Sequence, residues 1–94
     1  MGKEVKLFKS EERLPRNEVT QMLRTIADKL DQGSIHLKSG QDDIQLEIPG
    51  NLILEIQVEE ETKKSKGLQH SLEIELKWFE GDEGAEGAGG LELL

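Results

Sequence analysis

The chain has no cysteine and no tyrosine, and its 94 residues include only two phenylalanines, one tryptophan and two prolines. Without cysteine there are no disulfides and no thiolate metal sites, so packing alone must hold the core. Such a composition is typical of a reducing compartment. No stretch approaches the ~20 consecutive apolar residues of a membrane helix, and no signal peptide is visible. The sequence therefore predicts a small, soluble, cytoplasmic protein without a membrane segment.

Basic residues are missing from the last fifteen positions. The formal net charge is −8, and residues 80–94 carry five acidic residues and no base, which leaves −3 on residues 1–79. Most of residues 80–94 are glycine, alanine and acid, which cannot offset their own ordering entropy. We therefore expect one domain over residues 1–79 and a disordered Gly/Glu-rich acidic tail over residues 80–94. Nucleic acid is excluded as a partner, because binding phosphates needs clustered lysine and arginine beyond the short run Lys63, Lys64 and Lys66.

One amphipathic helix is expected from about Pro15 to Gln32. Apolar residues recur there at three- and four-residue spacing, which places them on one stripe; they are Val19, Met22, Leu23, Ile26, Ala27 and Leu30. Gly33 can adopt the left-handed conformation that ends a helix.

Alternating apolar and polar residues predict five strands, each with one buried and one wet face. They cover about residues 3–9, 35–38, 44–48, 52–59 and 72–78. Pro49-Gly50 is typical of a tight turn between the third and fourth of these strands. The helix stripe is the surface available to cover the apolar face of the sheet. The predicted fold is α+β: one amphipathic helix packed on one face of a mostly antiparallel five-stranded sheet, in the order β-α-β-β-β-β.

A family resemblance supports this fold. Residues 72–78, Leu-Glu-Ile-Glu-Leu-Lys-Trp, look like the signature of the amphi-Trp domain, an amphipathic strand that ends in tryptophan. Residues 23–33 are similar to the helix of that family, and residues 46–49 to its middle strand. The resemblance runs over about Lys3 to Phe79. It implies the fold and no activity.

No catalytic constellation is visible, and we expect that the protein is not an enzyme. Hydrolysis would need a positioned nucleophile and base, or paired carboxylates in a cleft. His36 and His70 have no fixed relation to a serine, and both are interpreted as structural. No glycine-rich phosphate loop or dinucleotide fingerprint precedes a helix. We predict no cofactor, no catalytic residue and no specific metal site.

The wet face of the predicted sheet is the candidate site. Its members are acidic or amide side chains that project from three successive strands: Gln45, Glu47, Glu55, Gln57, Glu59, Glu73 and Glu75. On neighbouring strands such carboxylates would stand ~5 Å apart and repel one another. Wide solvation, cations or a basic partner would relieve this repulsion, and the substitution Glu55→Lys is expected to be neutral or stabilising in the isolated protein.

The leading interpretation is a non-catalytic protein-interaction or accessory domain. It would bind another protein, or itself, through the open acidic sheet face or a strand edge, as a monomer or weak homo-oligomer. The alternative is a small ligand- or cation-binding domain, which a polar cavity around His70 would favour. A small enzyme is the third interpretation.

Overall fold

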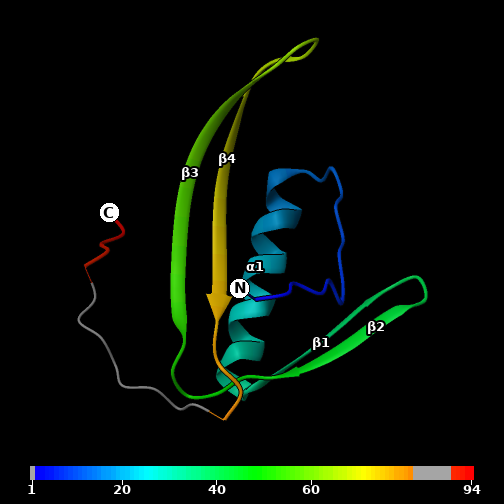
Figure 1. Cartoon of the computed structure of the whole chain (residues 1–94), viewed down its shortest axis with the longest axis vertical. Coiled ribbons are helices and arrows are strands. Elements are labelled where there is room, and N and C mark those ends of the chain that lie inside the picture. Colours follow the sequence, from blue (N-terminus) through cyan, green and yellow to red (C-terminus); the bar gives the residue numbers. More distant parts are fainter. Residues whose placement is uncertain (1, 82–89) are drawn as a thin grey trace. The chain divides into compact units, whose positions relative to one another are not determined.

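The computed structural model describes residues 2–81 and 90–94. The chain forms two compact units that divide between Ile48 and Pro49. The first unit contains helix α1 (Arg16–Gln32) and the strands β1 (Ser34–Ser39) and β2 (Asp42–Glu47), and the second contains the strands β3 (Ile53–Lys63) and β4 (Gly67–Lys77) (Figure 1). Each unit therefore contributes one antiparallel pair of strands, and α1 belongs to the first.

Helix α1 begins and ends where its sequence signals lie. Pro15 caps it with an extended backbone, and its carbonyl accepts hydrogen bonds from the N–H groups of Glu18 and Val19 at 3.0 and 3.2 Å. Gly33 ends the helix with φ +86°, a left-handed conformation that costs glycine little because it has no Cβ. The predicted helix is confirmed.

The β1–β2 hairpin carries the core of the first unit. Its register places Ile35 opposite Leu46 and Leu37 opposite Ile44. These side chains face one side of the sheet, and α1 packs against β1. Ile35, at 9% exposed, is the one apolar residue that is buried among the residues described. This unit therefore has a very small core.

The second unit is a long hairpin of two eleven-residue strands (Figure 1). Ile53 pairs with Lys77 and Lys63 pairs with Gly67, so odd-numbered residues of both strands share one face and even-numbered residues share the other. Gly67, at φ +84°, closes a turn of only three residues. Strands were expected over about residues 52–59 and 72–78, but ladder pairing extends to Lys63 and Gly67 because each added pair satisfies backbone groups.

The prediction of a single five-stranded sheet is wrong. The strands form two separate two-stranded sheets, β1–β2 and β3–β4, and the expected tight turn at Pro49-Gly50 does not join β2 to β3 in a hairpin. Alternation specifies which side of a strand is apolar, but the same alternation fits one continuous sheet or two hairpins. Pro49 also has no N–H with which to continue a ladder.

The first predicted strand is also absent from the structure. Among the described residues, 3–9 have no sheet partner; Val5 and Leu7 remain exposed, at 68% and 70%, and Phe8 is half-buried. Three apolar side chains are too few to offset the entropy of ordering the segment onto a sheet. The order observed is therefore α-β-β-β-β. The predicted tail disorder falls mainly on residues 82–89, which lie outside the described residues.

Candidate interaction surface

Five of the seven candidate residues lie on one side of the β3–β4 hairpin. They are the odd-numbered residues Glu55, Gln57, Glu59, Glu73 and Glu75. Glu55 is directly opposite Glu75, and Gln57 is directly opposite Glu73. Such neighbours have Cβ atoms ~5 Å apart, so the like charges of Glu55 and Glu75 repel one another. We call this side, the odd-numbered residues from 55 to 63 and from 69 to 77, the polar face.

The other two candidate residues are not part of the polar face. Gln45 and Glu47 lie on β2, opposite His36 and Ser34, in the other sheet and the other unit. The sequence interpretation grouped them with the rest because it assumed that β2 and β3 are neighbours. The candidate face is therefore reduced to the second unit.

Lys77 partly neutralises the opposed glutamates. Its Nζ donates a hydrogen bond to Oε1 of Glu55 at 2.9 Å and lies 3.8 Å from Oε1 of Glu75. The hydrogen bond to Glu55 and the charge of Glu55 raise the pKa of Lys77 above its ordinary 10.5, and the charge of Glu75 adds to them, while desolvation opposes the shift. An ammonium group is thus bound between two carboxylates on this face.

The middle of the polar face has no second lysine among its paired residues. The amide of Gln57 donates a hydrogen bond to Glu59 at 2.5 Å, and Glu59 pairs across the ladder with Ser71. Towards the turn, Lys63 lies 3.0 Å from Glu61. Glu59 and Glu73 therefore form an acidic centre between two lysines, Lys77 at one end and Lys63 at the other.

The two histidines are exposed and each contacts a carboxylate. On the first sheet His36 contacts Asp43. His70 lies on the even-numbered side of the second hairpin, and its Nδ1 is 3.2 Å from Oε2 of Glu60. Within residues 2–81 and 90–94, no three His, Asp or Glu side chains gather in a way that could hold a metal ion.

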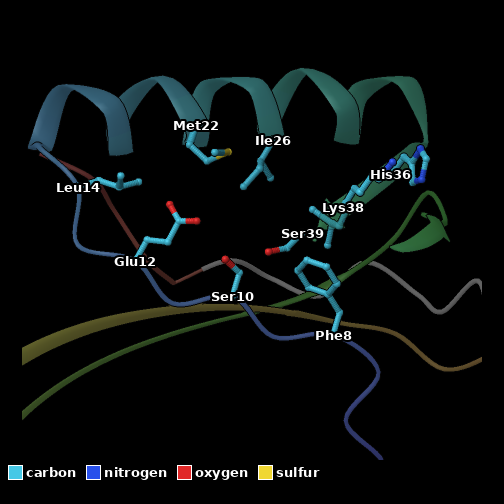
Figure 2. Close-up of a pocket in the computed structure, with 10 residues that line it drawn as sticks. Phe8, Ser10, Glu12, Leu14, Met22, Ile26, His36, Lys38 and Ser39 are labelled. Carbon is cyan, nitrogen blue, oxygen red and sulfur yellow. The ribbon is translucent and has the colours of Figure 1, made fainter. Parts of the chain in front are cut away.

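A pocket of about 520 Å³ lies in the first unit (Figure 2). Figure 2 shows Met22 and Ile26 pointing into it from α1, with Glu12 and Ser10 on the opposite wall. Half of the ten lining residues are apolar, Phe8, Leu14, Met22, Ile26 and Leu37, and the other half are polar, Ser10, Glu12, His36, Lys38 and Ser39. The pocket is on the α1 side of β1 and is not at His70, where the ligand-binding interpretation had looked for one.

Sequence reasoning missed Lys77 and the pocket for different reasons. Lys77 lies two residues after Glu75, so the alternation pattern by itself places both side chains on the same side of the strand. Its contact with Glu55 needs the register, which only pairing supplies. The pocket brings together residues 8–14, α1 and β1, which no local pattern connects.

Comparison with known proteins identifies the family. The family model of the Amphi-Trp domain matches residues 1–93, which is nearly the whole chain. The chain therefore belongs to the Amphi-Trp domain family. No curated protein and no solved structure matches it. Across the described residues, no helix is long and apolar enough to span a membrane.

Proposed function

We propose that this chain is a non-catalytic protein-interaction domain, whose polar face binds an extended basic segment of another protein. The observation that carries the proposal is the position of Lys77, whose ammonium lies against Glu55 at 2.9 Å and Glu75 at 3.8 Å. The ammonium group of Lys77 is an example, within the chain itself, of the basic group that the rest of the polar face would bind. Glu59 and Glu73 would accept the corresponding side chains of a partner.

The spacing on the hairpin suits an extended ligand. Residues of one face recur every second position, ~7 Å apart along a strand. A bound segment with a base at every second position would match that repeat. The charged side chains of this face are exposed, with Glu75 at 59% and Glu55 and Lys77 each at 45%. Exposed charges of this kind contribute mainly to association rate and specificity, so binding should weaken with salt.

A peptide in which lysine alternates with threonine tests the polar face directly. Fluorescence anisotropy should show salt-sensitive binding to the full chain. The double variant Glu59→Lys/Glu73→Lys should raise the dissociation constant at least about tenfold. A matched control is Glu4→Lys/Glu11→Lys, which changes the net charge by the same amount in residues 2–15. If both variants lose affinity equally, only net charge is acting and the polar-face proposal fails.

A strand edge is the other surface that the interaction proposal allows. Within the part of the chain that the structure describes, no further strand pairs with either edge of the β3–β4 hairpin, and backbone pairing needs no particular side chain. Peptide binding that survives the double charge reversal and does not change with salt would assign the interaction to an edge. Amide exchange along β3 and β4 would then show which edge is protected.

Small-ligand binding is a second candidate, supported by the pocket of the first unit. Its volume, about 520 Å³, lies within the usual ~300–1,000 Å³ range of ligand sites. Its mixed lining, which includes Lys38, fits an apolar ligand that carries one acidic group. Titration with decanoate should shift the amide resonances of residues 8–39, and Ile26→Trp, which fills the pocket, should abolish those shifts. Unchanged spectra at millimolar decanoate would remove this candidate.

A further inference from the structure

The pocket of the first unit has three walls, and one of them is a segment without helix or strand. This segment, residues 8–14, is called the strap, and every second residue of it lines the pocket: Phe8, Ser10, Glu12 and Leu14. The intervening residues Lys9, Glu11 and Arg13 are exposed and do not line the pocket. Such alternation is typical of an extended chain. The strap therefore presents a mixed side to the pocket and turns a fully charged side away from it.

The other two walls are built from hydrogen-bonded elements. Met22 and Ile26 belong to α1, and Leu37 belongs to β1, which pairs with β2 (Figure 2). In the described part of the chain, no backbone hydrogen bond joins the strap to α1 or to β1. The ion pair between Lys9 and Glu11, at 4.0 Å, is internal to the strap. The strap can therefore move without loss of a backbone hydrogen bond, whereas α1 and β1 are each held in shape by theirs.

The strap is anchored at its two ends. Leu14 continues directly into Pro15, the N-cap of α1. Phe8 is half-buried, while the other residues from Gly2 to Leu14 are exposed. Residues 9–13 lie between these two anchors. A segment that is held at both ends and has few bonds between them can move towards a bound ligand without leaving the site.

We propose that the strap closes over a ligand in the pocket and thereby completes the binding site. The inference rests on the small-ligand candidate above and takes the same ligand class, an apolar molecule with one acidic group. Ligand sites bury ~70–90% of the ligand surface, so all three walls have to contact the ligand. Closure moves the wall that loses no backbone hydrogen bond, and Phe8 and Leu14 add apolar contact from that side. The strap thus controls the entry and escape of the ligand.

A spin label on the strap tests this closure in the full chain. The sequence has no cysteine, so Glu11→Cys supplies a single thiol on the side of the strap that does not line the pocket. A nitroxide attached there should lose mobility when decanoate is added, as electron paramagnetic resonance would show. The matched control is Glu4→Cys, which lies outside the strap and whose label should not respond. An equal response at both positions would overturn the proposal.

The amide resonances of α1 separate the strap from the ligand site itself. In the unlabelled chain, decanoate should shift the resonances of Met22 and Ile26, which line the pocket. Shifts there without any change in the Glu11→Cys label would overturn the closure of the strap and leave the ligand site standing. If no resonance shifts, the small-ligand candidate fails, and the strap proposal fails with it.

Phe8→Ala tests the anchor by kinetics. A closed wall slows the escape of a ligand, so loss of the anchor should act mainly on the dissociation rate. NMR line shapes should show a dissociation rate constant for decanoate about tenfold higher in Phe8→Ala. The rate constant should be unchanged in Leu7→Ala, whose side chain is 70% exposed and does not line the pocket. If decanoate still immobilises the Glu11→Cys label in a Phe8→Ala chain, the anchoring that the proposal requires is overturned.

Discussion

Lys77 hydrogen-bonds to Glu55 across the β3–β4 ladder, although its direct partner in the register is Ile53. The 2.9 Å contact is therefore diagonal, and it brings the same ammonium to within 3.8 Å of Glu75. Glu55 and Glu75 are directly opposed like charges. Their repulsion is relieved within the hairpin itself, by a residue at the end of β4.

Stability at high pH should depend on Lys77. Its pKa in the folded chain is raised above the ordinary 10.5, first by the hydrogen bond from its ammonium to Glu55. The stabilisation is complete below the unfolded pKa and is lost as pH rises through the folded pKa. Denaturant titrations from pH 8 to 11.5 should show that the free energy of unfolding declines as the pH rises. The decline should be smaller in Lys77→Met and unchanged in Lys64→Met. An equal decline in both variants would show that Lys77 is not responsible.

Charge reversal on the polar face should depend on position. The sequence alone led us to expect that Glu55→Lys is neutral or stabilising, because it removes one like charge. The structure reverses that expectation. The substitution would remove the hydrogen bond between Lys77 and Glu55 and would place a second positive charge beside Lys77. Thermal denaturation should show a lower Tm for Glu55→Lys than for Glu73→Lys, whose direct neighbour is Gln57. Equal melting temperatures would mean that the Lys77 contact is not formed in solution.

The turn between β3 and β4 requires glycine at position 67. With φ +84°, Gly67 occupies the left-handed region, where a Cβ is costly. Gly67→Ala should lower the free energy of unfolding by about 1–2 kcal/mol. Gly50→Ala is the matched control, because Gly50 has no positive φ and a Cβ there meets nothing within 4 Å. Urea denaturation of both variants measures the difference, and equal losses would contradict the proposed strain.

The first unit should be sensitive to truncation at Ile35. Ile35 is 9% exposed and lies opposite Leu46 beside α1. Ile35→Ala should cost about 2–5 kcal/mol, because it empties the most buried site of a very small core. Amide exchange should accelerate in α1, β1 and β2. Exchange that stays protected there would show that the first unit does not depend on this residue.

The candidate site was predictable in part. Period-two alternation placed Glu55, Gln57 and Glu59 on one side of their strand, and Glu73 and Glu75 on one side of theirs, as the register confirms. It could not tell that Gln45 and Glu47 belong to another sheet. Side-chain direction is a local property of a strand, whereas the neighbour of a strand is decided by pairing between distant segments.

By itself, the sequence determined the features that depend on a few adjacent residues. The apolar stripe and Gly33 set the extent and end of α1, and alternation set the two faces of β3 and β4. Only the tertiary structure decided that the strands pair as two hairpins, that residues 3–9 join neither sheet, and that Lys77 reaches Glu55. Those outcomes depend on which backbone edges meet, and an amphipathic strand pattern is compatible with more than one partner.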